Sequence, residues 1–78
     1  MEKKIRVLLV GAAFSADLHM DGYSRCRELA EIVAICDKDA SRVESLAKRY
    51  GLTGYAAYEN YDEAIGEVEC DVVDICLP

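Results

Sequence analysis

The segment Gly11-Ala12-Ala13-Phe14-Ser15-Ala16 has the residue types of a turn that could hold phosphate groups. In such a turn the first position makes a tight bend, the third lets the backbone approach a pyrophosphate closely, and the sixth lets the helix pack closely on the strand. Each position therefore requires a small residue, usually glycine. Gly11 and Ala16 meet the first and last needs, whereas Ala13 stands where glycine is usual. Taken alone, the segment fits an ordinary strand-to-helix turn at least as well.

An acid at a suitable distance favours the phosphate interpretation. Asp37 ends an apolar run 21 residues after Ala16, where a carboxylate can accept hydrogen bonds from an adenosine ribose. It would repel a 2′-phosphate, which favours NAD over NADP, although Lys38 could soften that preference by pairing with the phosphate. The plainer alternative is that Asp37 and Asp39 merely start the next helix. Together, the turn and the acid predict a dinucleotide site.

The histidine, one buried-strand acid and the cysteines give weaker indications of function. His19 is the only histidine, and we expect a structural hydrogen bond from it, with a place beside the cofactor as the alternative. Asp74, a charge inside an apolar run, should be paired or lie at the rim of a sheet. The four cysteines contain no C-x-x-C spacing, which indicates buried thiols in a cytoplasmic protein rather than disulfides, a zinc site or a redox switch.

The elements that must position these residues alternate along the chain. We expect strands over 5–10, 32–36, 54–57 and 71–77, and helices over 15–31, over 40–50 and after Asn60. Strands that alternate with helices at this rhythm predict an α/β fold with a parallel sheet. We expect four strands in the order 3-2-1-4 with three crossover helices. The topological switch then lies between the first and fourth strands, whose carboxyl ends carry Gly11 and Pro78.

The helical patterns identify the faces that should pack on the sheet. The first helix should present Leu18, Gly22, Cys26 and Leu29, the second Val43, Leu46, Ala47 and Tyr50, and the third Tyr61, Ala64, Ile65 and Val68. The second helix should start at a Ser41–Glu44 capping box or at Asp39, and Gly51 should end it. Asn60 should cap the third helix.

Composition excludes several classes of function. Nine Lys and Arg face 15 Asp and Glu, a net charge of −6, which disfavours binding to nucleic acid or to anionic membranes. No apolar run reaches membrane-spanning length, and residues 7–10 are too short for the apolar part of a signal peptide. We expect a cytoplasmic homo-oligomer.

The last apolar run stops at Pro78 and would leave a strand edge exposed. We interpret residues 1–78 as the N-terminal part of a dinucleotide-binding domain whose substrate domain lies elsewhere. The alternative is a natural miniature whose last strand is covered by a partner subunit.

Six segments together resemble one family. They are residues 4–14 (KIRVLLVGAAF), the Leu18-His19 pair, residues 33–37 (VAICD), 46–51 (LAKRYG), 58–61 (YENY) and 70–78 (CDVVDICLP). The combination resembles the N-terminus of the Gfo/Idh/MocA oxidoreductases. The resemblance implies a Rossmann domain that binds NAD, or NADP, in an enzyme that transfers hydride to or from a sugar, inositol or related polyol.

The resemblance also implies roles for single residues. Gly11, Ala13 and Phe14 would line the pyrophosphate, Asp37 and Lys38 the adenosine ribose, and Leu77 with Pro78 the other flank of the cofactor. The family's Glu-Lys-Pro segment and its substrate-binding Asp and His residues have no counterpart in this sequence, so we expect no turnover from these 78 residues alone.

The sequence leaves two other functions open. A non-catalytic nucleotide-binding or interaction module would suit Ala13 and the missing catalytic residues. An S-adenosylmethionine-dependent methyltransferase also has a glycine turn after its first strand, but residues 6–10 carry no acid before Gly11.

Overall fold

Aliphatic runs alternate with segments of helical period, and the chain folds accordingly into alternating strands and helices. The computed structural model describes residues 3–77. Its elements are β1 (Ile5–Val10), α1 (Phe14–Ser24), β2 (Ala30–Cys36), α2 (Ala40–Arg49), β3 (Ala56–Tyr58), α3 (Tyr61–Glu67) and β4 (Val72–Ile75). The strands form one parallel sheet in the order β3-β2-β1-β4, which confirms the predicted α/β fold and strand order.

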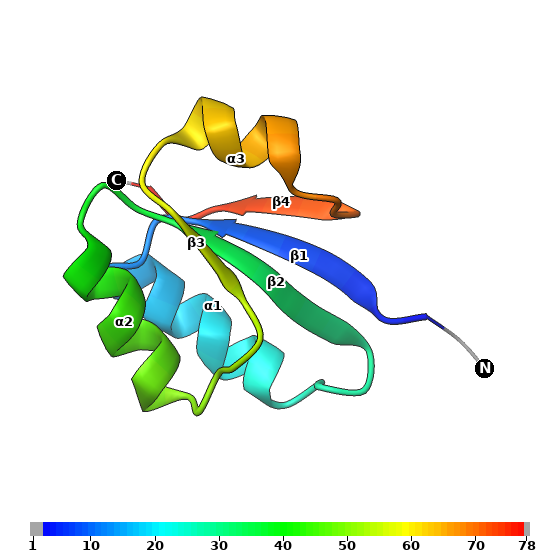
Figure 1. The fold of residues 1–78 in the computed structure, drawn as a ribbon. Coiled ribbons are helices and arrows are strands. Elements are labelled where there is room, and N and C mark those ends of the chain that lie inside the picture. The colour runs from blue at the N-terminus through cyan, green and yellow to red at the C-terminus, as the bar shows by residue number, and fades with distance from the viewer. Residues whose placement is uncertain (1–2, 78) are drawn as a thin grey trace.

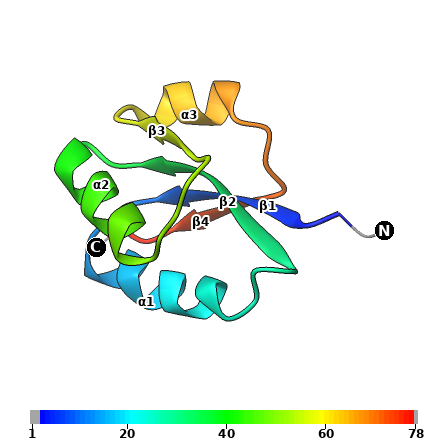
Figure 2. The ribbon, with the colours of Figure 1, turned by 60° about the horizontal axis from the view of Figure 1, so that its bottom comes forward.

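The sheet is covered on both faces. Helices α1 and α2 lie on one face and α3 lies on the opposite face (Figures 1 and 2). The central strand β1 therefore buries consecutive side chains: Val7 and Leu9 pack toward α1 and α2, while Leu8 and Val10 pack toward α3. This two-sided burial explains why the strand is an unbroken aliphatic run.

The first helix is shorter than predicted and presents a different face. It ends at Ser24 instead of residue 31, and β2 begins at Ala30 instead of Ile32. Leu18 and Leu29 are each 59% exposed, whereas Ala16 and Met20 are the buried residues of the helix. The residues after Ser24 form tight turns, with hydrogen bonds from Cys26 N to Tyr23 O and from Leu29 N to Cys26 O. These turns contain neither glycine nor proline, so no residue type marks the end of the helix.

The other two helices begin where the sequence predicts. Asp39 caps α2 by accepting from Ser41 N at 3.0 Å, so of the two predicted caps the acid is the one used. Gly51 follows α2 with a φ of +62°, and Asn60 caps α3 by accepting from Glu63 N at 2.9 Å.

Three local predictions need correction. The third strand spans Ala56–Tyr58 instead of residues 54–57, and the fourth strand spans Val72–Ile75 instead of residues 71–77. On α3, Ala64 is buried as predicted, but Tyr61 and Ile65 remain 43% exposed because α3 has only seven residues and covers little of its face of the sheet.

The cysteines are all free thiols: Cys36 and Cys76 are buried, and Cys26 and Cys70 are partly buried. Within residues 3–77, none of the helices has the length and apolar character needed to span a bilayer.

Candidate functional site

Parallel pairing brings the carboxyl ends of the strands to one edge of the sheet. Gly11 follows β1, Asp37 follows β2 and Leu77 lies beyond the end of β4. Three residues that are far apart in the sequence therefore come together where open α/β sheets bind their ligands.

Gly11 is required by the close approach of two strand ends. Its φ is +96°, a conformation that side chains disfavour. A Cβ atom on Gly11 would lie 2.7 Å from the Cys76 carbonyl oxygen and 3.2 Å from Leu77 Cδ2. The glycine therefore lets the chain turn from β1 into α1 directly against the end of β4.

The N-terminus of α1 differs from those of the other two helices. Asp39 and Asn60 cap α2 and α3 through their side chains, but the N-cap of α1 is Ala13, which makes no side-chain hydrogen bond. The first N–H groups of a helix have no partner within the helix and lie at the positive end of its dipole. The start of α1 can therefore bind an anion through its backbone.

Asp37 is directed toward this turn. Its Oδ2 accepts a hydrogen bond from Ala12 N at 2.8 Å, and its Oδ1 accepts one from Asp39 N at 2.8 Å. Each carboxylate oxygen can accept a second hydrogen bond. Asp37 therefore fixes the turn after β1 and keeps capacity for hydroxyl donors.

Two hollows border this arrangement. One, of about 460 Å³, is lined by Val10, Cys36, Asp37, Lys38, Arg42, Glu59, Tyr61 and Leu77. The other, of about 340 Å³, lies at the starts of α1 and α2 and is lined by Ala12, Ala13, Phe14, Asp17, Ser41, Arg42, Ser45 and Arg49. The turn from β1 into α1 borders the smaller hollow through Ala12 and Ala13, and the last residue of β1, Val10, borders the larger one.

The structure thus brings most of the predicted site residues to one edge. Asp37, Lys38 and Leu77 line the larger hollow, and Ala13 and Phe14 line the smaller one. Gly11 forms the turn itself. Pro78 lies outside the described residues.

Sequence reasoning missed the arginines of this edge, Arg42 and Arg49, which both line the smaller hollow. Arg42 lines both hollows. It lies in the first turn of the helix that follows Asp37, so its position close to the predicted acid could have indicated it.

His19 and Asp74 lie together outside both hollows. His19 Nδ1 is 2.7 Å from Asp74 Oδ2, and the Tyr23 hydroxyl donates to the same oxygen at 2.7 Å. Burial opposes ionisation of Asp74, but the hydrogen bonds from His19 and Tyr23 outweigh it and hold the pKa of this carboxyl below its usual value. Asp74 is therefore paired, as predicted, and His19 makes the expected structural hydrogen bond.

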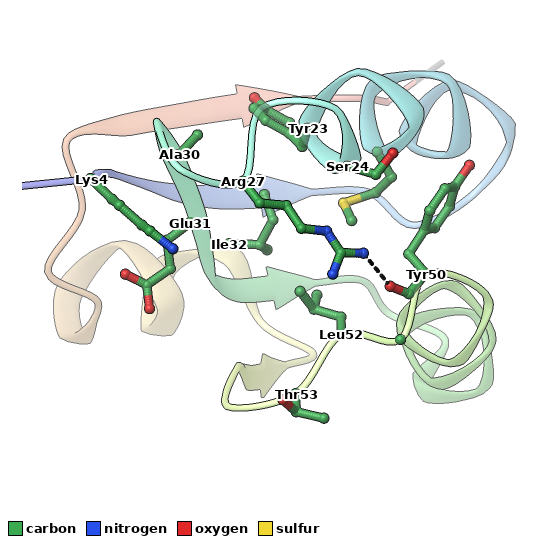
Figure 3. A pocket seen from close by; sticks show the side chains of 12 residues that line it. Lys4, Tyr23, Ser24, Arg27, Ala30, Glu31, Ile32, Tyr50, Leu52 and Thr53 are labelled. Atoms are coloured by element: carbon green, nitrogen blue, oxygen red, sulfur yellow. Dashed lines mark hydrogen bonds between the residues drawn. The ribbon is translucent and has the colours of Figure 1, made fainter.

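A third hollow lies at the opposite, amino edge of the sheet (Figure 3). It has a volume of about 200 Å³, and its lining includes Lys4, Tyr23, Arg27, Tyr50 and Leu52. The Arg27 guanidinium donates to the Tyr50 carbonyl oxygen at 2.9 Å. This link ties the loop after α1 to the end of α2.

A parallel sheet in the order 3-2-1-4, with a glycine turn after β1 and an acid after β2, is typical of a Rossmann dinucleotide-binding domain. The model of the Gfo/Idh/MocA oxidoreductase family, which describes its NAD-binding Rossmann fold, matches residues 5–78. The chain therefore belongs to this family of NAD-dependent oxidoreductases, as the sequence resemblance implied.

One curated protein is similar in sequence, and two solved structures are similar in fold. D-glucoside 3-dehydrogenase of Escherichia coli (strain K12) is 32% identical over 74 residues, which make up 95% of this chain and 20% of the relative. The WlbA dehydrogenase of Chromobacterium violaceum, solved with NADH and UDP-GlcNAcA, matches 99% of this chain and 21% of its own with a TM-score of 0.86 and 23% identity. Scyllo-inositol dehydrogenase of Lactobacillus casei, solved with NAD(H) and scyllo-inositol, matches 97% of this chain and 22% of its own with a TM-score of 0.81 and 20% identity. The chain spans about a fifth of the length of these relatives.

Proposed function

We propose that this domain holds NAD across the carboxyl edge of its sheet, with the pyrophosphate at the start of α1 and the adenosine ribose on Asp37. The observation that carries the proposal is the N-terminus of α1. Its N-cap Ala13 makes no side-chain hydrogen bond, whereas α2 and α3 are capped by their own side chains. A pyrophosphate oxygen would accept from the N–H groups that a capping side chain would otherwise satisfy.

The residues at this edge fit the parts of the dinucleotide. Gly11, Ala13 and Phe14 form the turn that would line the pyrophosphate, and Asp37 with Lys38 borders the hollow that would receive the adenosine ribose. Leu77 and Pro78 would flank the cofactor at the end of β4. The Ala13 methyl group would keep the pyrophosphate slightly farther from the backbone than a glycine would.

The charges around the ribose position favour NAD. The Asp37 carboxylate borders the hollow and would repel a 2′-phosphate, while Lys38 and Arg42 line the same hollow and would reduce this repulsion. We expect NAD to bind more tightly than NADP, with NADP still able to bind.

We further propose that the whole enzyme transfers hydride to or from a sugar, inositol or related polyol. Relatives named as a glucoside dehydrogenase and an inositol dehydrogenase support this substrate class. The nicotinamide supplies the hydride chemistry when it is bound, and the residues of this chain orient the cofactor. Residues 1–78 would then be the N-terminal part of the cofactor-binding domain, without turnover of their own. Substrate-dependent formation of NADH by this chain alone would contradict that last expectation.

The proposed cofactor site can be tested by thermal melting of the 78-residue chain with NAD, NADP or S-adenosylmethionine. A ligand that binds the folded state raises the melting temperature. We expect the largest rise with NAD. Asp37→Ala should lower NAD affinity by about tenfold or more, because hydrogen bonds to charged groups contribute about 1.5–3 kcal/mol.

Asp62→Asn is the matched control for Asp37→Ala, because it removes an exposed acid from the first turn of α3. This variant should keep the affinity of the unmodified chain. Equal loss of affinity in both variants, or a rise with S-adenosylmethionine but not with NAD, would overturn the proposed site.

A further inference from the structure

Three possible metal ligands from two elements meet on the α1 face of the sheet. His19 comes from the middle of α1, Asp74 from β4, and Cys76 lies just beyond the end of β4. His19 Nδ1 is 2.7 Å from Asp74 Oδ2 and 3.3 Å from Cys76 Sγ, and Cys76 Sγ is 3.7 Å from Asp74 Oδ1. One ligand atom from each residue can be chosen so that all three lie within 4.8 Å of one another.

These separations approach the geometry of a tetrahedral metal site. Zinc binds histidine nitrogen and carboxylate oxygen at about 2.0–2.2 Å and thiolate sulfur at about 2.3 Å, which places neighbouring ligand atoms about 3.5 Å apart. His19 Nδ1 lies 2.7 Å from Asp74 Oδ2 and 3.3 Å from Cys76 Sγ, so each of these two pairs would have to separate by less than about 1 Å to admit an ion. The sequence predicts no zinc site, because it has one histidine and no C-x-x-C spacing, but the fold places an acid and a thiol beside that histidine.

The surroundings of the cluster also suit a divalent cation. Asp74 and Cys76 would supply two negative charges against the two positive charges of the ion. The Tyr23 hydroxyl, which donates to Asp74 Oδ2 at 2.7 Å, holds the carboxylate in place from outside the ligand set. Cys76 is 4% exposed, while the His19 side chain is 46% exposed. The cluster is therefore open to solvent on one side, where an ion could enter and a water molecule could complete its coordination.

We propose that His19, Asp74 and Cys76 form a Zn²⁺ site with one open coordination position. The site is separate from the NAD site, since none of its three ligands lines the two hollows at the carboxyl edge. Burial raises the pKa of the Cys76 thiol to about 11, so this thiol is protonated at neutral pH. Formation of the zinc–sulfur bond transfers that proton to solvent. The bound ion would link α1 to β4.

Cobalt(II) is the probe for this site, because a cobalt–thiolate bond absorbs in the near ultraviolet. We expect the metal-free 78-residue chain to bind one equivalent of Co²⁺ with this absorption, and excess Zn²⁺ to displace the Co²⁺ and abolish it. Cys76→Ser should remove the thiolate absorption. His19→Gln, whose amide can still donate to Asp74, should weaken Co²⁺ binding at least tenfold.

Cys70→Ser is the matched control, because Cys70 is a partly buried thiol outside the cluster. This variant should bind Co²⁺ like the unmodified chain. The proposal is overturned if the folded chain shows no thiolate absorption, or if the absorption persists in Cys76→Ser. It is also overturned if His19→Gln, shown to be folded by circular dichroism, binds Co²⁺ as tightly as the unmodified chain.

Discussion

The two edges of the sheet are built from the same strands and helices but present opposite backbone groups. At the carboxyl edge, the turn from β1 leads to the uncapped start of α1. At the amino edge, α2 ends in a C-terminal turn whose carbonyl groups are already bonded: Tyr50 O accepts from Arg27, and Lys48 O accepts from Gly51 N. One edge therefore offers donors to an outside anion, while the other satisfies its acceptors with its own residues.

This difference follows from topology. In a parallel α/β sheet, each crossover helix starts at the carboxyl edge and ends at the amino edge, so the positive ends of the helix dipoles gather at one side. The hollow of Figure 3 is lined by cationic and aromatic side chains, but the helices reach it with their C-termini. A hollow alone therefore does not identify the ligand site. The direction of the backbone groups distinguishes the two edges.

The largest expected effect comes from blocking the turn at the carboxyl edge. Gly11→Val should abolish measurable NAD binding and destabilise the fold. The positive φ alone costs about 1–3 kcal/mol, and the new Cβ would overlap the Cys76 carbonyl oxygen at 2.7 Å. Urea unfolding and NAD titration measure the two effects.

Gly22→Ala is the control for this substitution, because Gly22 lies inside α1 and a Cβ there would meet no atom within 4 Å. It should stabilise the chain by about 0.5–1 kcal/mol. If Gly11→Val unfolds at the same urea concentration as the unmodified chain and still binds NAD, the account of the turn is wrong.

The second prediction makes the two edges more alike by capping α1 with a side chain. Ala13→Asp should stabilise the chain by about 0.5–2 kcal/mol, because it gives the helix an N-cap acceptor. The same carboxylate would occupy and repel the pyrophosphate position, so NAD affinity should fall at least tenfold, or about 1.4 kcal/mol. Thermal melting with and without NAD shows both changes.

Ala13→Ser separates capping from charge, since serine can cap the helix without adding a negative charge. It should stabilise the chain similarly and reduce NAD affinity less than Ala13→Asp does. An Ala13→Asp chain that is both more stable and binds NAD normally would show that α1 does not hold the pyrophosphate.

At the amino edge, Arg27→Ala should affect stability alone. Loss of its hydrogen bond to the Tyr50 carbonyl should cost about 0.5–1.5 kcal/mol, with NAD affinity unchanged. Arg25→Ala, which removes an exposed pair with Asp21, should cost only about 0.3–0.5 kcal/mol. Urea unfolding of the two variants measures the loss of stability in each. A change in NAD affinity in Arg27→Ala would contradict the expectation that this contact affects stability alone.

The smallest effect is a dependence of stability on acid pH that both edges share. Hydrogen bonds from Arg6 lower the pKa of Asp71 at the amino edge, and hydrogen bonds from Ser41 lower the pKa of Asp39 at the carboxyl edge. Because the folded-state pKa values are lowered, this stabilisation is fully present above the ordinary value of 3.8. It is lost as the pH falls through the folded-state values.

Urea midpoints measured from pH 6 down to the acid range should therefore fall with decreasing pH, and Asp71→Asn should flatten part of that dependence. Asp62→Asn, which removes a carboxyl from the first turn of α3, is the comparison variant. An identical pH profile for Asp71→Asn and the unmodified chain would contradict this account of the Arg6–Asp71 contact.

The features that the sequence predicts correctly depend on local residue patterns or on the direction of the strands. The aliphatic run of β1, the cap residues Asp39 and Asn60, and the meeting of Gly11 with Asp37 at one edge are of this kind. The end of α1 was missed because its turns contain ordinary residues. The contact of His19 with Cys76 was missed because it depends on how α1 is rotated over β4, and the wrongly chosen face of that helix concealed it.

The double role of Asp37 constrains any change of cofactor preference. The carboxylate that would discriminate between the two nicotinamide dinucleotides also holds the Ala12 amide at 2.8 Å. A substitution at position 37 that removes the acceptor oxygens together with the charge, such as alanine, would admit the extra phosphate but would also release the loop that would hold the cofactor. Retargeting this domain to NADP therefore calls for a neutral replacement that still accepts a hydrogen bond, such as serine or asparagine.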